Sequence, residues 1–391
     1  MIKTKRLDFL DSLRGFAAIF VMLNHFYAAY DMGRRPLFSW IYYTPLHFFY
    51  IAPAAVSLFF VLSGYVLALS LNKSPNIDVI PFYVKRVVRI WPTYLAAFAL
   101  SYILYRNYTI IQTSLASTAW IRTFWRTHVD GLHIFKQLFL LDDDQKVLVP
   151  QSWSLRAIMQ FSLLIPFLYF ICKKTNNLTF LILNLVLYFA FRGPYLIFHF
   201  SLGVYLAVNQ QQVLEYFAML KKRFNVLLIL ATIVLYTYNY NIPVYYRYIL
   251  GKDLPLFSTE AVMRLATGLG SFFILLYCLS SPRLQKALSY KPFVQFGKLT
   301  YGIYVTHFMV LLYAVPLIIR DLNRAGITNR HEVIPAAVVG LLVITTLISY
   351  LIKVLVEQPF LKLEKRILNK KAKQQQGTTN TGQQPEAIVL T

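Results

Sequence analysis

Long runs of apolar residues dominate this sequence, and ten of them are candidate membrane spans. A helix rises about 1.5 Å per residue, so roughly 20 mainly apolar residues cross the hydrocarbon core of a bilayer. The charged fraction is only 14% and the hydrophobic fraction is 57%, which is more apolar than the core of a soluble domain requires. The sequence therefore predicts an all-α integral membrane protein with a bundle of about ten transmembrane helices. The runs lie at 9–30, 48–71, 90–106, 153–172, 177–192, 194–209, 224–242, 259–280, 296–319 and 333–356.

Basic residues gather at one end of successive runs, and this pattern predicts the orientation of the chain. The 39 Lys and Arg outnumber the 16 Asp and Glu, and cytoplasmic loops of membrane proteins are enriched in Lys and Arg. If the N-terminus is in the cytoplasm and the number of spans is even, the basic clusters lie in the cytoplasm. Both termini then lie there too. We expect a multi-pass protein of the cell (inner) membrane. The bias also explains the net charge of +23 better than nucleic-acid binding does, because no reading motif accompanies it.

Two segments outside the spans complete the predicted organisation. Residues 107–152 form the longest extracytoplasmic connection, and their apolar stretches are too short to span, so we expect re-entrant or amphipathic helices over the bundle. Residues 361–391 are basic and rich in Gln and Thr, which predicts a disordered cytoplasmic tail. One membrane domain is therefore expected over residues 1–360.

Arg14 and His25 are polar residues of the first run. They are 11 residues apart, close to three helical turns, so both project from the same face and are separated by about 16 Å along the axis. A charged group or imidazole inside a bilayer must face protein or water, and it indicates a functional site by default. A hydrogen-bonded packing role for His25 is the alternative. We interpret the pair as catalytic residues.

Arg86 and Arg89 lie one helical turn apart in KRVVRIWP, at the predicted cytoplasmic start of the third span. Two guanidinium groups at this spacing can hold one phosphate-bearing ligand. Together with Arg14 they would form one anion-binding site. The neighbouring Lys85 is better explained as an ordinary cytoplasmic anchor.

Several further residues are candidates for substrate binding. Tyr301 and His307 of the ninth run lie on one helical stripe with Tyr304, a pattern that interhelical hydrogen bonding also explains. Trp153 opens the fourth run. Glu260 begins the eighth run, where it can form an internal ion pair with Arg264. The chain has two cysteines and no ligand-like spacing, so no metal site is predicted.

These segments, taken in order, resemble the acyltransferase 3 family, which transfers acyl groups, usually acetyl from acetyl-CoA, to sugars and other extracytoplasmic acceptors. The resemblance runs through most of the chain and implies ten spans with cytoplasmic termini. It also places the family's arginine and histidine of the first span on Arg14 and His25, and its paired arginines on Arg86 and Arg89. The matching segments are LRGFAAIFVMLNH, FFVLSGYVLAL, KRVVRIWP, WSL, LTYGIYVTH and VEQPF.

One position departs from the family pattern. The family commonly has a glutamate three residues after the Leu of WSL, and Ile158 stands there. Another acid such as Glu260 could replace it, or the acceptor chemistry or activity could differ. Some family members carry an additional SGNH-type hydrolase domain, and we expect this chain to be the stand-alone form.

The resemblance implies an O-acetyltransferase that uses acetyl-CoA as donor and a carbohydrate hydroxyl as acceptor, as in O-antigen, capsule or exopolysaccharide. The donor phosphates would bind the three arginines, and the thioester would meet His25. His25 would act as a general base, or would help to form an acyl-enzyme through a tyrosine. A transporter or flippase of a glycan or acyl precursor is the alternative, because buried charge also marks transport pathways. The acceptor sugar and the oligomeric state stay open.

Overall fold

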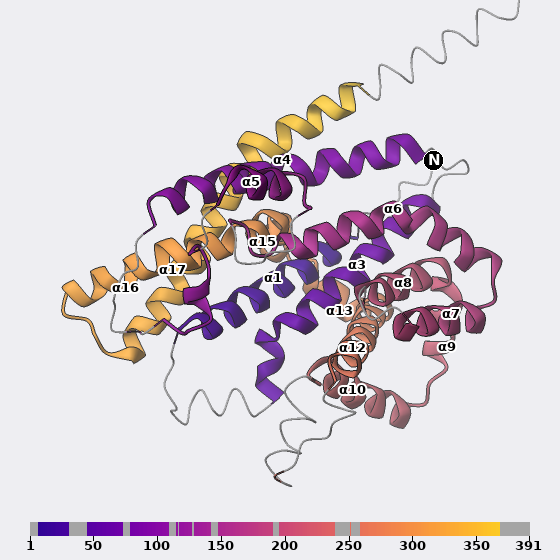
Figure 1. Cartoon of the computed structure of the whole chain (residues 1–391). Helices are drawn as coiled ribbons and strands as arrows, with labels where there is room; N and C mark the ends of the chain where they lie inside the picture. The colour runs from indigo at the N-terminus through magenta and orange to yellow at the C-terminus, as the bar shows by residue number, and fades with distance from the viewer. Residues whose placement is uncertain are drawn as a thin grey trace, which may run out of the picture.

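The computed structural model describes residues 7–30, 45–72, 79–108, 115, 117–126, 129–141, 148–190, 195–238, 251 and 259–367. Within these ranges every extended regular element is a helix (Figure 1). The first half contains α1 (Asp8–Ala29), η1 (Pro45–Tyr50), α3 (Ala52–Asn72), α4 (Val79–Arg106), η2 (Ile121–Thr123), α5 (Gly131–Leu138), α6 (Ser152–Lys174) and α7 (Asn177–Ala190). The second half contains α8 (Tyr195–Val208), α9 (Gln210–Ala218), α10 (Lys222–Tyr236), α12 (Glu260–Ser280), α13 (Pro282–Leu288), α14 (Lys291–Gly297), α15 (Thr300–Met309), η3 (Val310–Ala314), α16 (Val315–Arg324), α17 (Arg330–Ile352) and η4 (Lys353–Glu357).

The predicted all-helical membrane architecture is confirmed. Each of the ten predicted runs overlaps a helix, and six helical stretches are long and apolar enough to cross a membrane. The count of ten spans and the cytoplasmic placement of the termini stay predictions, since residues 1–6 and 368–391 lie outside the described residues. The six stretches are Ala52–Asn72, Ile80–Arg106, Ser152–Lys174, Glu260–Ser280, Thr300–Arg324 and Arg330–Ile367.

Helix α3 lies at the centre of the bundle. It packs against α1, α6, α8 and α12 (Figure 1), and apolar residues occur all around its axis. A helix that is hydrophobic all round is a buried helix. Tyr65 and Phe60 of α3 are fully inaccessible to solvent and belong to the principal core cluster. The other helices are therefore arranged around α3.

Two glycines allow α3 and α8 to approach closely. A Cβ atom added to Gly64 of α3 would clash with the backbone carbonyl of Phe200 of α8. A Cβ atom added to Gly203 of α8 would clash in the same way with the carbonyl of Val61 of α3. Small residues at such crossings are typical of membrane helices, where van der Waals packing drives association.

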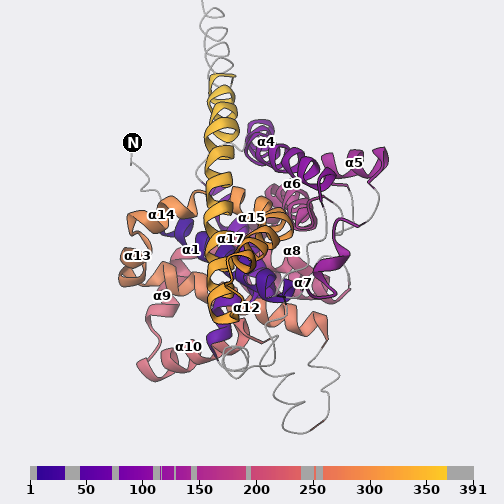
Figure 2. The ribbon, with the colours of Figure 1, turned by 90° about the vertical axis from the view of Figure 1, so that its left-hand side faces the viewer.

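Two helix boundaries differ from those predicted. Helix α4 begins at Val79, eleven residues before the predicted start at 90, so Arg86 and Arg89 lie within a helix that also contains Pro92. The last helical stretch runs from Arg330 to Ile367, beyond the predicted domain end at residue 360 (Figure 2). In α4 the charged residues Lys85, Arg86 and Arg89 interrupt the apolar run, and charged residues also follow the last apolar run, so a search for apolar runs does not detect either extension.

Two π-helical turns occur among the residues that the structure describes, and each ends two residues before a proline. η3 ends at Ala314 before Pro316, and η4 ends at Glu357 before Pro359. In a π-helix a carbonyl pairs with the amide five residues on, but proline has no amide hydrogen. The carbonyl of Leu311, whose π partner would be Pro316, instead accepts a hydrogen bond from the Tyr30 hydroxyl at 3.0 Å. This bond ties the end of α1 to η3.

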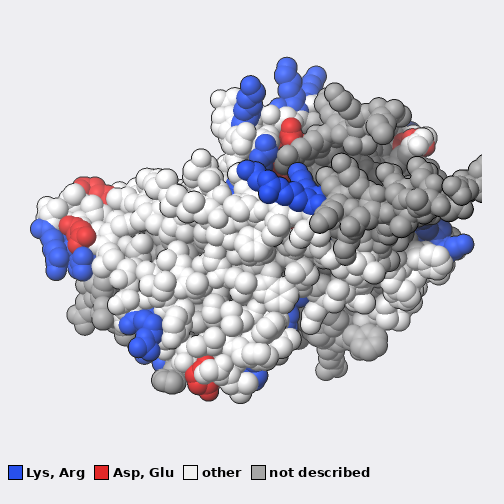
Figure 3. Space-filling model, turned by 90° about the horizontal axis from the view of Figure 1, so that it is seen from above, with Lys and Arg blue, Asp and Glu red and all other residues white. Residues whose placement is uncertain are grey.

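Charged side chains are unevenly distributed over the surface. Most of the face in Figure 3 is uncharged, and Lys and Arg gather in a few clusters. Many exposed side chains of the spans are large and apolar, including Leu163 and Phe167 of α6 and Leu347 of α17. Such a surface is suited to lipid rather than water.

Replacement of Gly64 by alanine tests the α3–α8 contact. The added methyl group meets a backbone carbonyl that cannot rotate away, so we expect a loss of about 1–3 kcal/mol and a lower melting temperature in detergent. Gly131→Ala on α5 is the matched control, because nothing lies within 4 Å of a Cβ atom there. Equal melting temperatures of the two variants would contradict the close contact.

Candidate active site

His25 of α1 and His307 of α15 form a direct hydrogen bond. Nδ1 of His25 lies 2.9 Å from Nε2 of His307, and the two rings are nearly parallel, with an interplanar angle of 17°. The two residues are 282 positions apart in the sequence. His307 is 1% exposed, whereas His25 is only partly buried. The pair therefore has one inner and one accessible imidazole.

The hydrogen bonds around His307 fix the arrangement of protons when both rings are neutral. Nδ1 of His307 donates to the backbone carbonyl of Tyr304 at 2.8 Å, with the carbonyl of Ile303 at 3.2 Å. A neutral imidazole carries a single N–H, so Nε2 of His307 must accept, and Nδ1 of His25 must donate to it. The lone pair on Nε2 of His25 is then available to take a proton. A base oriented by a second group is the arrangement used in nucleophilic catalysis.

Aromatic rings surround His25. The ring of Phe308 lies 5.4 Å from that of His25, and the ring of Trp120 lies 5.8 Å away. Trp120 belongs to the connection between α4 and α6. This segment is held on α1 by Thr118, whose hydroxyl donates to the carbonyl of Ala28 at 2.7 Å and whose amide donates to the carbonyl of Ala29 at 2.9 Å. The connection thus covers the end of α1 that carries His25.

The start of α6 holds α15 in place. The amide nitrogen of the Gln151 side chain donates to the carbonyls of Tyr304 and Val305, at 2.9 and 2.7 Å. Ser154 shares a hydrogen bond with the Tyr304 hydroxyl at 2.8 Å. All three side chains are buried. These contacts fix the backbone segment that orients His307.

The three predicted arginines lie toward the other end of α1. The charges of Arg89 and Arg14 both act on Arg86, so the guanidinium groups of α1 and α4 lie within electrostatic range of one another. Arg86 is partly buried and Arg89 is exposed. Because α1 is one continuous helix, Arg14 and His25 keep the separation of about 16 Å expected from their spacing.

Two carboxylates accompany the arginines. Asp11 accepts a hydrogen bond from Arg14 at 3.3 Å, one helical turn away on α1. Glu357 of η4 is within electrostatic range of Arg89 and Lys353. Lys353 also donates to the carbonyl of Lys298 at 3.2 Å. Among the described residues of this region, the cations from α1, α4 and η4 therefore outnumber the carboxylates near them.

The remaining predicted residues lie in several places. Tyr301 donates its hydroxyl to the carbonyl of Ile90 at 2.7 Å, which joins α15 to α4 near the arginines. Trp153 is half-buried and packs on the principal core cluster. Ile158 packs there too, so the position of the family's glutamate faces apolar side chains here. Their predicted roles in substrate binding, and the effect of Ile158, stay predictions.

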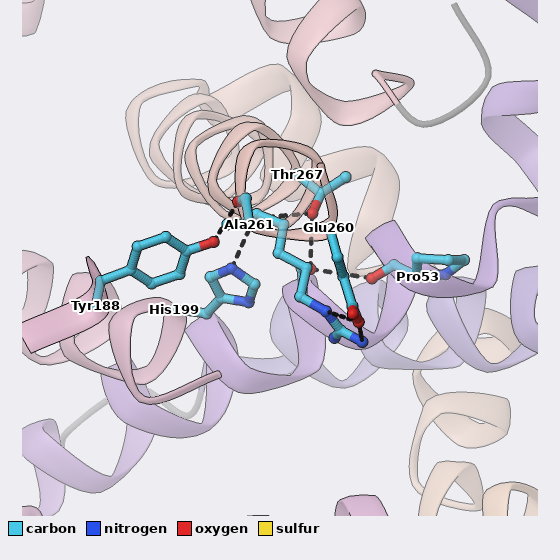
Figure 4. Close-up of polar contacts among 8 residues, drawn as sticks. Pro53, Tyr188, His199, Glu260, Ala261 and Thr267 are labelled. Carbon is cyan, nitrogen blue, oxygen red and sulfur yellow. Dashed lines mark hydrogen bonds and ion pairs between the residues drawn. The ribbon is translucent and has the colours of Figure 1, made fainter. Parts of the chain in front are cut away.

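Glu260 belongs to a separate cluster at the start of α12 (Figure 4). The expected ion pair is present, since Nε of Arg264 lies 2.8 Å from the Glu260 carboxylate. It is not internal, because 60% of the Glu260 side chain is exposed. Its neighbours are His199, whose Nε2 lies 2.8 Å from the Arg264 carbonyl, and Tyr188, which donates to the Ala261 carbonyl. α3, α7, α8 and α12 build this cluster, whereas α1 and α15 build the histidine pair.

Metal ligands do not cluster in the part of the chain that the structure describes. No group of three or more His, Cys, Asp and Glu side chains is close enough there to hold an ion. Cys172 and Cys278 are free and buried.

Sequence reasoning found His25, His307 and the arginines but not the contacts between them. A pairing between residues 282 positions apart leaves no periodic signal in one sequence. Gln151 and Trp120 were also missed, since both lie in or beside the long connection rather than in an apolar run. Burial cannot be read from one sequence, so no sequence signal singles out either residue.

Comparison with known proteins assigns the chain to a family. The family model described as an acyltransferase domain matches residues 7–354, which is nearly the whole chain and includes every residue of the histidine pair and the arginine cluster. No curated protein and no solved structure matches the chain. On the strength of the family match, this chain belongs to the acyltransferase 3 family of membrane acyltransferases.

Proposed function

We propose that the protein is a membrane O-acetyltransferase that transfers acetyl from cytoplasmic acetyl-CoA to a hydroxyl of an extracytoplasmic carbohydrate, such as O-antigen, capsule or exopolysaccharide. The observation that carries this proposal is the separation of two sites on α1. An arginine cluster lies near one end and an oriented imidazole base near the other. CoA has its phosphates and its thioester at opposite ends of an extended arm, so it matches such a pair of sites.

The arginine cluster supplies the donor site. Arg14, Arg86 and Arg89 offer planar, permanently charged groups that match phosphate oxygens. Arg86 is partly buried among like charges, which favours binding of an anion that compensates them. From there the pantetheine arm would extend over about 16 Å along α1 to His25.

His25 supplies the base for acyl transfer. Its Nε2 takes the proton from the acceptor hydroxyl as the hydroxyl oxygen forms a bond to the thioester carbonyl carbon. The carbon–sulfur bond then breaks, and the CoA thiolate leaves with the proton returned by His25. The products are the acetyl ester and free CoA. His307 holds His25 in the correct tautomer and orientation through the 2.9 Å bond.

Direct transfer is favoured over a tyrosine acyl-enzyme. The hydroxyl of Tyr304 is bonded to Ser154 and that of Tyr301 to the Ile90 carbonyl, so both of these tyrosines of α15 are engaged in interhelical contacts. Burial of the Tyr304 side chain also separates it from an incoming acceptor. The accessible group of the site is the imidazole of His25.

Alanine replacement of the two histidines tests the catalytic pair. We expect His25→Ala and His307→Ala each to lower kcat for acetyl transfer by about 10²–10⁴-fold, with little change in the Michaelis constant for acetyl-CoA. Because the two rings act as one unit, the double variant should lose hardly more than His25→Ala alone. Acetyl transfer to the carbohydrate and release of CoA are measured on purified protein.

His331→Ala on the exposed start of α17 is the matched control, since it also removes an imidazole. All variants are compared by melting temperature so that unfolding is recognised. Full multiplicative loss in the double variant would show that the histidines act independently. Unchanged acetylation in His25→Ala would end the proposal.

Neutralisation of Arg86 tests the donor site. Loss of a charge-assisted phosphate contact in Arg86→Gln should raise the Michaelis constant for acetyl-CoA about 10–100-fold, with a smaller effect on kcat. Lys85→Gln, one residue away and exposed, should leave it unchanged. A raised Michaelis constant for the carbohydrate alone would contradict the docking role. A comparison of surface polysaccharide mass with and without the gene identifies the acceptor class.

A further inference from the structure

An apolar cavity of about 660 Å³ lies between α7, α8, α9, α10 and α12. None of these helices carries His25, His307 or the three arginines. Every residue that lines the cavity is Leu, Ile, Val, Phe or Tyr. Its volume falls within the roughly 300–1,000 Å³ of ordinary ligand pockets.

The cavity has a closed floor and an open side. Leu202 of α8 and Leu276 of α12 form part of the floor and are 4% and 3% exposed. The rim includes Ile182 of α7, Tyr216 of α9 and Leu220, which lies two residues beyond α9. These side chains are 52%, 62% and 40% exposed. In a multi-pass membrane protein, an apolar cavity open at its side is accessible to the acyl chains of the bilayer.

Basic residues stand at one end of this cavity. Lys221, Lys222 and Arg223 follow the lining residue Leu220 directly in the sequence, and all three are exposed. Lys173 and Lys174 end α6 on the same predicted cytoplasmic side, and the Asn177 side chain at the start of α7 donates to Gln212 in the first turn of α9 at 3.0 Å. The only acid from 171 to 238 is Glu215, which accepts a hydrogen bond from Gln211.

We propose that the cavity binds one anionic phospholipid, with an acyl chain between α8 and α12 and the phosphate beside Lys221, Lys222 and Arg223. The apolar lining matches the chain, and the cations match a headgroup with net negative charge. A zwitterionic lipid would fill the same volume but leave the cations uncompensated. Lys221, Lys222 and Arg223 lie on the predicted cytoplasmic side, where anionic lipids create a negative surface potential.

A bound lipid would complete the packing of this side of the bundle. The floor residues of α8 and α12 make contacts with protein on one face and with the cavity on the other, so an empty cavity forfeits dispersion contacts there. A bound chain restores these contacts. The lipid should therefore stabilise the protein as well as bind to it.

Photo-cross-linking locates the lipid directly. The purified full-length protein in detergent is irradiated with phosphatidylglycerol that carries a diazirine in one acyl chain, and labelled peptides are mapped by mass spectrometry. We expect the label in α7–α10 or α12, and competition by unlabelled phosphatidylglycerol but not by phosphatidylcholine. A label confined to other helices would overturn the proposal, as would equal competition by the two lipids.

Charge and cavity variants separate the two parts of the site. Lys222→Gln with Arg223→Gln should lower labelling by about fivefold or more, whereas Arg283→Gln with Lys286→Gln on α13 should not. Ile182→Trp should obstruct the cavity and lower labelling, whereas Leu347→Trp on the exposed face of α17 should not. If the Lys222 and Arg223 double variant and Ile182→Trp are labelled as strongly as their control variants, the proposed lipid site is contradicted.

Melting temperature and an alternative occupant complete the test. Phosphatidylglycerol should raise the melting temperature of the wild type more than that of the Lys222 and Arg223 double variant. A polyprenyl phosphate that competes far better than phosphatidylglycerol would overturn the proposal in favour of a lipid-linked substrate. These measurements need no acetyl transfer, so they are independent of the proposed enzymatic function.

Discussion

The candidate active site depends on the close approach of α1 to α14 and α15. Gly297 lies against the backbone of Asp11, where any side chain would clash, and a Cβ atom on Gly15 would be 3.1 Å from the Cα atom of Gly297. Farther along the same interface Ala18, Met22 and Ile303 form a small buried cluster. Because these contacts are made of small or fully buried groups, the spacing of the two helices is fixed. The 2.9 Å bond between His25 and His307 follows from that spacing.

The sequence alone was sufficient for the class of fold and for the residues with chemistry, but not for their partners. Apolar runs of bilayer length predict membrane helices because the bilayer imposes one dominant constraint. The start of α4 was predicted too late. Hydropathy alone begins this helix near residue 90, whereas the helix begins at Val79 and already contains Arg86 and Arg89. The His25–His307 pairing depends on tertiary packing, which one sequence does not encode as a period. The number of spans and the site roles are still predictions.

Neither position considered from the sequence for an acceptor-binding carboxylate takes part in the histidine pair as described. Ile158 packs against the apolar core, and Glu260 is bonded to Arg264 in the separate cluster of Figure 4. Helix α6 contributes instead through Gln151, whose amide binds the backbone next to His307. An amide that binds carbonyls positions the helix without bringing charge into the bundle, which avoids the cost of burying a carboxylate.

The π-turns also determine which faces of the last helices look inward. Each residue of an α-helix turns the chain by about 100°, so one extra residue in a turn rotates everything beyond it by that angle. η3 thus sets the rotation of α16 about its axis relative to α15. In the same way, η4 sets the rotation of the helix beyond Glu357 relative to α17. Removal of one residue from η3 would swing α16 away from its neighbour α17 while leaving His307 in place. The proline after each π-turn has no amide hydrogen to donate, so the extra residue cannot easily move to another position along the helix.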